Sequence, residues 1–399
     1  MPLIVRGLMV AQALALSAAP LLILVGGLIG HQLHPDPRFA TLPVAAMICG
    51  TAFAALPAAR LAQRFGRRRL FILAMFSGAL FSLCAALSVA QHWFTGFTLA
   101  ALGIGGVNAV VQQFRFVAMD AADAGKAPLI AARLLLAGLV SAFLGPELTR
   151  LNDWYPPLGE GAAFGALIVC YLLAAMILSW IMPRTVVVSA QVAEAGRSWS
   201  ELLQQPALPL AILSAACGYG VMAYVMTATP LSMTQGMGYP LSDAKWVIQS
   251  HIMAMYLPSL LSGQLIQWLG FRRMIFSGVL VMLACLSVAW WDQSFLHYWL
   301  GLVLLGLGWN LLFVAGTALL RRCYRAEEAG RVEGINDMLV FACQAFGALA
   351  SGSLVLLLGW KGMLLTTLPA LLLLLLVLLR TPRRSLSAGA EAAQGADQS

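Results

Sequence analysis

Residues 59–68 read Ala-Arg-Leu-Ala-Gln-Arg-Phe-Gly-Arg-Arg, and residues 263–272 read Gly-Gln-Leu-Ile-Gln-Trp-Leu-Gly-Phe-Arg. The two segments carry Leu, Gln, Gly and Arg at the same places, and one constant distance along the chain separates each matched pair. Self-similarity at a fixed spacing is the sequence sign of an internal structural repeat. The matched pairs are Leu61 and Leu265, Gln63 and Gln267, Gly66 and Gly270, and Arg68 and Arg272.

Two further segments repeat at nearly the same distance. Residues 121–126 (Ala-Ala-Asp-Ala-Gly-Lys) resemble residues 326–331 (Ala-Glu-Glu-Ala-Gly-Arg). Residues 102–105 (Leu-Gly-Ile-Gly) likewise resemble residues 305–308 (Leu-Gly-Leu-Gly). These matches predict that the chain consists of two related halves, which follow one another as a parallel repeat.

The composition places both halves in a membrane. The chain is 61% hydrophobic and only 10% charged, with a mean hydropathy of +0.85, whereas a soluble protein needs more charge on its surface. Its apolar runs approach the roughly 20 residues that a helix needs to cross a bilayer, and backbone groups in lipid must bond internally. We predict an all-α polytopic membrane protein with six spans in each half. The twelve spans lie near residues 8–30, 40–60, 70–91, 95–117, 129–151, 162–182, 206–231, 245–266, 273–291, 297–320, 335–358 and 361–380.

The basic residues predict how the spans are oriented. With the N-terminus in the cytoplasm, all but four of the 24 Lys and Arg residues lie on the cytoplasmic side, which positive charge favours. The exceptions are Arg38, Arg150, Lys245 and Lys361. We therefore expect a multi-pass protein of a bacterial-type inner membrane with both termini in the cytoplasm. We attribute the net charge of +8 to this topology and expect no binding of nucleic acid.

The spans also predict the limits of the parts. Residues 1–183 form an N-terminal six-helix bundle, 184–204 a cytoplasmic linker, 205–380 a C-terminal six-helix bundle and 381–399 a disordered cytoplasmic tail. The seven cysteines form no CxxC pair and lie in or beside spans, so we interpret them as apolar packing residues. We expect no disulfide framework and no metal site.

The segment after the second span is similar to the loop 2–3 signature of the major facilitator superfamily, Gly-x-Leu-Ala-Asp-Arg-x-Gly-Arg-Arg. With the two six-helix halves, the resemblance extends over the whole chain. It implies the fold of that superfamily, with two six-helix bundles related by pseudo-two-fold symmetry, and the activity of a secondary transporter. The residues that carry the match are Leu61, Ala62, Arg64, Gly66, Arg67 and Arg68.

The signature is altered at two places, where Ala59 replaces its first Gly and Gln63 replaces its Asp. In the family this Asp is thought to help hold the cytoplasmic side closed, so the resemblance implies that a charge-based latch is weakened here. Gln267 makes the same replacement in the second half. Independently of the family, Gly66 and Gly270 permit tight turns, and the arginines favour a cytoplasmic loop beside anionic headgroups.

Span 5 carries Gly145-Pro146, part of a motif that the resemblance links to proton-coupled exporters. Pro146 removes a backbone hydrogen bond, and Gly145 allows a close helix contact. The pair has two interpretations. It is either a mark of export or a packing kink without bearing on the direction of transport.

Few ionisable residues fall inside the predicted spans, where each is energetically expensive. Glu147 lies in the outer third of span 5 and His251 in the outer third of span 8. The resemblance implies that these two helices face each other, so Glu147 and His251 could pair, share a proton or close an outer gate. The alternatives are that Glu147 pairs with Arg150 and that His251 only bonds a neighbouring helix.

Arg115 and Asp337 are two further candidates for coupling or gating. Arg115, near the inner end of span 4, serves either as a countercharge for substrate or as a side chain that reaches the cytoplasm or pairs with Asp120. Asp337, at the inner end of span 11, is favourable near a helix N-terminus. It can also meet the span 2–3 loop in an inner gate.

The resemblance implies that spans 1, 4, 7 and 10 line a central path, so their polar and aromatic residues are the candidates for substrate binding. Asn108 and Asn310 are near-equivalents in the two halves, where a midplane site is expected. Buried amides need partners, which are either a substrate or neighbouring helices. Aromatic and Met side chains suit an amphipathic, planar organic substrate. The candidates are Gln12, Asn108, Gln112, Tyr219, Tyr224, Trp309 and Asn310.

These features predict a monomeric secondary active transporter of a small organic molecule that works by alternating access. Proton-coupled export (efflux) is the first hypothesis, and import of a nutrient, vitamin or metal chelate is the second. Protons are favoured over sodium because a His lies among the intramembrane ionisable residues. A membrane enzyme or a sensor without transport is the third hypothesis. The sequence has no HExxH, GxSxG or phosphate-loop motif, so we expect neither an enzyme nor a cofactor.

Overall fold

The structure, a computed structural model, describes residues 3–114, 117–118, 127–154, 159–183, 196–325, 328–382 and 386. Within these ranges, the side chains of residues 59, 63, 127–136, 153–154, 262–263 and 329–330 are not described. The predicted linker is described only from residue 196, and the predicted disordered tail only at residues 381–382 and 386. The proposed limits of both segments therefore stay predictions.

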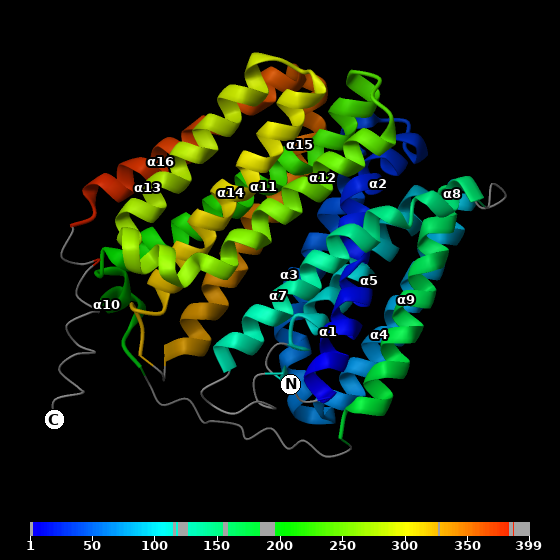
Figure 1. Cartoon of the computed structure of the whole chain (residues 1–399), viewed down its shortest axis with the longest axis horizontal. Coiled ribbons are helices and arrows are strands. Elements are labelled where there is room, and N and C mark those ends of the chain that lie inside the picture. Colours follow the sequence, from blue (N-terminus) through cyan, green and yellow to red (C-terminus); the bar gives the residue numbers. More distant parts are fainter. Residues whose placement is uncertain are drawn as a thin grey trace.

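The first half of the chain forms the bundle on the right of Figure 1, coloured from blue to green. Its first two helices, on either side of Ser17, follow one another along a single predicted span. The elements are α1 (Leu3–Leu16), α2 (Ala18–Leu33), η1 (Pro37–Phe39), α3 (Leu42–Phe65), α4 (Arg67–Ala90), α5 (Phe94–Val111), α7 (Ala127–Glu147), α8 (Arg150–Trp154) and α9 (Gly161–Ile181).

The second half forms the bundle on the left of Figure 1, coloured from green to red. A short helix precedes it at the end of the linker. The elements are α10 (Trp199–Leu203), α11 (Ala207–Leu231), η4 (Ser232–Gly236), α12 (Leu241–Tyr256), η5 (Leu257–Leu261), α13 (Ser262–Trp291), α14 (Phe295–Leu320), α15 (Ala329–Leu365) and α16 (Leu368–Arg380).

Nine stretches of the described chain are long and apolar enough to cross a membrane. One of them, Arg331–Arg380, covers two predicted spans because α15 turns at Gly359 before α16 follows. The predicted spans at 129–151 and 245–266, which are not among the nine, correspond to α7 and to α12 with η5 and the start of α13. The predicted all-α polytopic fold is therefore confirmed.

The predicted tight turns occur in both copies of the repeat. Gly66 has φ of +86° between α3 and α4, and Gly270 has φ of +68° where α13 turns from one span into the next. Residues other than glycine rarely adopt such a positive φ. The glycines at these two positions therefore fix the short connection between the second and third spans of each half.

An arginine two residues after each of these glycines binds the carboxyl end of a distant helix. Arg68 donates to the carbonyl oxygen of Ser179 on α9 at 2.7 Å, and Arg272 donates to that of Thr381 after α16 at 2.8 Å. The last carbonyl groups of a helix have no partner within the helix, so a cationic donor stabilises them. The sequence repeat is thus also a structural repeat. In each half, this arginine joins the third span to the end of the sixth.

Glycine also sets the distance between the second and fourth spans of each half. A Cβ atom placed on Gly105 of α5 would lie 1.9 Å from the carbonyl oxygen of Met47 on α3. A Cβ atom placed on Gly306 of α14 would lie 2.6 Å from that of His251 on α12. Met47 and His251 are separated by the same distance in sequence as the matched pairs of the repeat. The same backbone contact therefore occurs in both halves.

Side chains sort into a shared core and an apolar outer surface. One continuous cluster of buried hydrophobic residues includes members of every long helix of both halves. Large apolar side chains also lie on the outside, such as Trp180 on α9 and Phe346 on α15, which are 80% and 73% exposed. Lipid tails are as apolar as these side chains, so a membrane can cover them without cost.

The described end of the linker is fastened to the second half. α10 begins with a capping box formed by Ser198 and Glu201. Just before it, Arg197 donates to both carboxylate oxygens of Glu328, at 2.8 and 2.7 Å, and Arg331 donates to the carbonyl oxygen of Arg197. The hydrogen bonds from Arg197 hold the pKa of the Glu328 carboxyl well below its usual range. This carboxylate therefore stays ionised, and the ion pair intact, at neutral pH.

Gly105→Ala is expected to destabilise the protein, because the added methyl group has no room between two backbones. Overpacking of this kind costs about 1–3 kcal/mol. Gly106→Ala is the matched control, since a methyl group there would find its nearest neighbour, Ala54 Cβ, at 3.7 Å. Thermal unfolding of the purified protein in detergent should show a lower midpoint for the Gly105 variant only. Equal midpoints for both variants would contradict the proposed tight crossing.

Candidate substrate path and gate

Four aromatic side chains gather in the second half on α11, α12 and α14. Trp309 and Phe313 stack, with ring centroids 5.1 Å apart and planes inclined by 11°. Tyr219 meets both rings edge-on, at 5.0 Å from Trp309 and 4.9 Å from Phe313. Tyr256 approaches Trp309 edge-on at 6.3 Å. We call Tyr219, Tyr256, Trp309 and Phe313 the aromatic wall. Trp309 is buried and the other three rings are partly buried, and uncharged rings of this kind can pack against an apolar or aromatic molecule.

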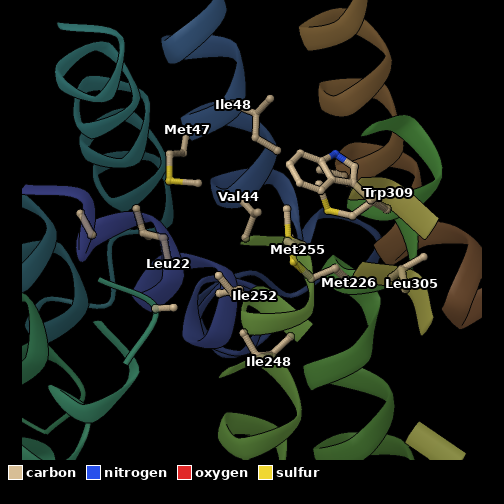
Figure 2. Packing of buried hydrophobic residues seen from close by; sticks show 14 of the residues in the cluster. Leu22, Val44, Met47, Ile48, Met226, Ile248, Ile252, Met255, Leu305 and Trp309 are labelled. Atoms are coloured by element: carbon tan, nitrogen blue, oxygen red, sulfur yellow. The ribbon is translucent and has the colours of Figure 1, made fainter. Parts of the chain in front are cut away.

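The first half meets the second with aliphatic and Met side chains. Side chains from both halves lie together in one apolar cluster. The second half contributes two methionines to it, Met226 on α11 and Met255 on α12, whose flexible side chains adapt to irregular surfaces. Figure 2 shows Leu22, Val44, Met47 and Ile48 from α2 and α3 together with Met226, Ile252, Met255 and Trp309 from α11, α12 and α14.

Five buried polar atoms on α5, α11 and α14 have no hydrogen-bond partner among the described residues. Three of them are Oδ1 of Asn108, the hydroxyl oxygen of Thr227 and the indole Nε1 of Trp309, and the others are the hydroxyl oxygen of Thr98 and Oδ1 of Asn310. A buried polar atom without a partner costs about 1–3 kcal/mol. A ligand that supplies the missing partners would recover this free energy. Asn108 and Trp309 were predicted as substrate-binding residues, and Thr227 joins them on the same ground.

Asn310 and Tyr224 instead bond within the second half. Asn310 Nδ2 donates to the carbonyl oxygen of Met255 at 2.7 Å and to the hydroxyl of Ser259, which fastens α14 to α12 and η5. The Tyr224 hydroxyl shares a 2.8 Å hydrogen bond with that of Thr366, between α15 and α16. These contacts favour the alternative interpretation, in which buried polar groups bond neighbouring helices. The binding role predicted for these two residues stays a prediction.

The other predicted path residues lie away from the aromatic wall in sequence and element. Gln12 is half-buried on α1, and Gln112 is exposed at the C-terminal end of α5. Arg115 lies outside the described residues, so its proposed role as a countercharge stays a prediction. Within the described chain, no cluster of three or more His, Cys, Asp or Glu side chains could hold a metal ion.

The two halves meet at the end of the bundle opposite Leu3, at the top of Figure 1, which we call the distal end. Here Glu147, the last residue of α7, accepts from Lys245 Nζ at 2.9 Å and from Arg150 Nε at 2.8 Å. Gln249 also donates to Glu147, at 3.4 Å. The alternative pair of Glu147 and Arg150 is therefore present. A second ion pair, to Lys245 on α12, joins the two halves.

His251 does not take part in this network, so the predicted pairing with Glu147 is wrong for this conformation. His251 is fully buried, and its Nδ1 bonds the carbonyl oxygen of Leu302 on α14 at 2.8 Å. Its Nε2 has no partner in the part of the chain that is described. The reason is helical geometry: Lys245 and Gln249 are four residues apart and share the face toward α7, whereas His251 points to another face.

Further contacts at the distal end join α3 and η1 to α15. The Thr41 hydroxyl donates to the carbonyl oxygen of Leu349 at 3.5 Å, and the Ser353 hydroxyl donates to that of Arg38 at 3.1 Å. Gly352 lies so close to Thr41 that a Cβ atom on it would be 2.6 Å from the Thr41 hydroxyl oxygen. The halves therefore touch at the distal end mainly through side chains.

The rest of the loop 2–3 motif surrounds the turn at Gly66. Leu61 is 40% exposed, the guanidinium of Arg64 lies 5.3 Å from the centroid of the Phe65 ring, and Arg67 begins α4. The side chain of Gln63 lies outside the described set. The effect of replacing the family's Asp at this position therefore stays a prediction.

Asp337 lies near the start of α15 and is exposed. It accepts a hydrogen bond from Asn336 Nδ2 at 3.2 Å. Its role in an inner gate stays a prediction.

Four residues that the structure brings together were not predicted from the sequence. Lys245 and Gln249 bind Glu147, and Tyr256 and Phe313 belong to the aromatic wall. Two of the four, Gln249 and Phe313, could have been found from their spacing. Gln249 follows Lys245 by four residues and Phe313 follows Trp309 by four, so each pair shares one face of a helix.

Comparisons with known proteins agree on one family. The family model described as Major Facilitator Superfamily matches residues 8–240 and residues 210–397. A riboflavin transporter, RfnT, from Brucella anthropi is 33% identical over 380 residues, which cover 94% of this chain and 95% of that protein. An uncharacterized MFS-type transporter, YdeG, from Bacillus subtilis is 28% identical and covers 83% of this chain and 80% of its own.

One solved structure shares the fold at low sequence identity. It is a bacterial homologue of the human lysosomal transporter Spinster in an inward-facing and unoccupied conformation. It matches with a TM-score of 0.72 and 12% identity, and the match covers 96% of this chain and 97% of that one.

Glu147→Gln is expected to loosen the distal end, because it removes the ionic partner of Lys245. A partly exposed ion pair contributes up to roughly 1 kcal/mol, which corresponds to a change of about five-fold in the open population. The measurement is the rate at which an impermeant maleimide labels a cysteine placed at Leu28, a buried residue of the distal end, in a chain that lacks its native cysteines. Labelling should be about five-fold faster in the Gln variant.

Arg150→Ala is the matched control for this experiment. It also removes a partner of Glu147, but Arg150 belongs to the same half of the chain. Labelling should therefore change little in the Ala variant. Equal acceleration by both variants would show that the charge of the distal loops, and not the contact between the halves, sets the rate.

Proposed function

We propose that this chain, which belongs to the major facilitator superfamily and is a transporter of that family, carries riboflavin or a closely similar planar heterocycle into the cell. The observation that carries the proposal is the 33% identity to a riboflavin transporter over nearly the full length of both chains. The predicted second hypothesis, a vitamin importer, is thereby preferred over the first.

The aromatic wall supports a flat aromatic cargo. Riboflavin combines a three-ring isoalloxazine with a chain of hydroxyl groups, so it needs both a stacking surface and polar partners. Trp309 and Phe313 stack on each other, and Tyr219 and Tyr256 meet the Trp309 ring edge-on. A flat cargo would join this group of rings. Stacked or edge-on aromatic pairs contribute about 0.5–1.5 kcal/mol each beyond the burial of area.

The buried atoms of Asn108, Thr227 and Trp309 without partners among the described residues support the polar part of the cargo. Asn108 Oδ1 and the Thr227 hydroxyl accept hydrogen bonds, and Trp309 Nε1 donates one. Hydroxyl groups, ring carbonyls and the ring N–H of riboflavin match these donors and acceptors. No side chain of the aromatic wall is charged, which suits a neutral molecule.

Import is the proposed direction. The expectation of export depended on Gly145-Pro146, and close packing gives the glycine of that pair a structural role. A Cβ atom on Gly145 would lie 2.3 Å from the carbonyl oxygen of Ser17, where α7 crosses the junction of α1 and α2. A vitamin is also a nutrient, which a cell gains by taking it up.

Alternating access is the proposed mechanism. The distal contacts of Glu147 with Lys245 and of Ser353 with Arg38 would close one side of the path and would break when the halves rock apart. Coupling to protons stays a prediction. Both predicted residues, Glu147 and His251, have hydrogen-bond partners of their own within the structure.

The test is flux of radiolabelled riboflavin in membrane vesicles of known orientation, prepared from a riboflavin-auxotrophic bacterium that expresses the chain. Right-side-out vesicles should accumulate riboflavin several-fold above vesicles without the protein. Accumulation only in inside-out vesicles would reverse the proposed direction, and no flux in either orientation would reject riboflavin as cargo. An uncoupler and removal of sodium, applied in the same assay, identify the coupling ion.

Trp309→Ala should raise KM for riboflavin about ten-fold, because it removes the stacking face and a hydrogen-bond donor worth together about 1.4 kcal/mol or more. Trp180→Ala is the control, because Trp180 is 80% exposed on the outer surface of α9. KM is measured in right-side-out vesicles and corrected for the amount of each variant. An unchanged KM for Trp309→Ala would remove the aromatic wall from the binding site.

A further inference from the structure

A cavity of about 500 Å³ opens in the second half beside the turn at Gly270. Residues on both sides of this turn in α13 and the last residues of α16 form its walls, and Leu386 also contributes. Its volume falls within the roughly 300–1,000 Å³ typical of small-molecule sites. None of its residues belongs to the aromatic wall or to the contacts at the distal end. The cavity is therefore separate from the proposed path.

One side of the cavity is apolar and open to the surroundings of the protein. Phe276 and Leu379 are 41% and 59% exposed, whereas Leu378 beside them is buried. In a membrane, the exposed pair would lie against hydrocarbon chains. The cavity thus joins the lipid-facing surface of the second half to the turn between its second and third spans.

The other side of the cavity is basic. Arg272 and Arg273 line it, and the guanidinium of Arg322 lies 4.7 Å from the centroid of the Phe271 ring, which is another of its walls. Arg272 uses one nitrogen to bind Thr381, while Arg273 is exposed. Within the described part of the chain, no carboxylate forms an ion pair with any of these three arginines. The cavity therefore carries uncompensated positive charge.

We propose that this cavity binds an anionic glycerophospholipid, with the phosphate against Arg272 and Arg273 and an acyl chain along Phe276 and Leu379. A planar guanidinium matches the geometry of a phosphate group. Basic pockets between spans on the cytoplasmic side are suited to anionic headgroups, and the predicted topology places the Gly270 turn on that side. A free phosphate ion would satisfy the arginines and leave the apolar wall uncovered. A lipid satisfies both sides.

Binding at this place would stabilise the second half. The lipid would contact α13 on both sides of its turn and α16 at its end, and Arg272 already joins these two helices. A ligand that binds only the folded protein raises the midpoint of thermal unfolding. The unfolding temperature is therefore a direct measure of binding.

The experiment titrates the full-length protein, in a zwitterionic detergent, with phosphatidylglycerol, with phosphatidylcholine of the same acyl chains, and with inorganic phosphate. Phosphatidylglycerol should raise the unfolding midpoint, and the other two should not. Arg273→Ala should weaken the apparent affinity for phosphatidylglycerol about five-fold, the effect of about 1 kcal/mol per basic residue. Arg273→Lys, which keeps the charge but not the planar guanidinium, should restore only part of the loss.

Arg69→Ala is the matched control, because Arg69 is the repeat equivalent of Arg273 and is exposed at the corresponding place on α4. Equal weakening by the Arg69 and Arg273 variants would reduce the effect to general attraction and overturn the proposal. Stabilisation by phosphatidylcholine, or by phosphate alone, would also overturn it.

Leu379→Gln tests the apolar wall of the cavity and leaves its charge unchanged. This exposed substitution should weaken the affinity as well, and an unchanged affinity would again reject the site.

Discussion

Helices in this protein approach one another so closely that only glycine fits at the crossings, and the rest of the structure depends on these contacts. A Cβ atom on Gly105, Gly306 or Gly145 would meet a carbonyl oxygen of the neighbouring helix at 1.9, 2.6 or 2.3 Å. In a bilayer, helices gain nothing by hiding apolar surface from water, so close packing must supply the attraction between them. Small residues make that packing possible, and because the contacts involve backbone, their geometry cannot adapt. Each half is held in one arrangement as a result.

Contacts between the halves are of another kind. At the distal end they are an ion pair of Glu147 with Lys245 and hydrogen bonds from the side chains of Thr41 and Ser353. Side chains exchange partners by rotating, whereas interlocked backbones do not. The backbone contacts keep the helices within each half fixed, whereas the side-chain contacts between the halves can break and re-form. It is the combination that rigid-body rocking of two repeats around a central site requires.

Features governed by local chemistry could be predicted from the sequence. Gly66 and Gly270 turn the chain because residues other than glycine rarely adopt their φ values. The repeat follows from residues matched at a fixed spacing, and the spans follow from the apolar runs. Pairings across the path could not be predicted, because they depend on the rotation of each helix about its axis. Two residues separate Gln249 from His251, which is about 200° around a helix. Trp309, in the aromatic wall, and Asn310, which bonds α12, are neighbours in sequence.

Under the proposed function, binding of the cargo would contribute free energy to the shift between the two arrangements of the halves, and buried polar atoms are one place where that free energy would come from. Moving a two-state equilibrium from 1:99 to 99:1 takes about 5.5 kcal/mol of preference for one state. The atoms of Asn108, Thr227 and Trp309 that have no partner among the described residues would each recover roughly 1–3 kcal/mol when bonded. Asn108 belongs to the first half and the other two to the second, so a ligand that bonds all three has to fix the distance between the halves. A flat molecule held mainly by the rings of the aromatic wall, which all belong to the second half, would depend less on the distance between the halves. Under the proposed function, selection of cargo would therefore depend on its hydroxyl chain and ring edges more than on its ring faces.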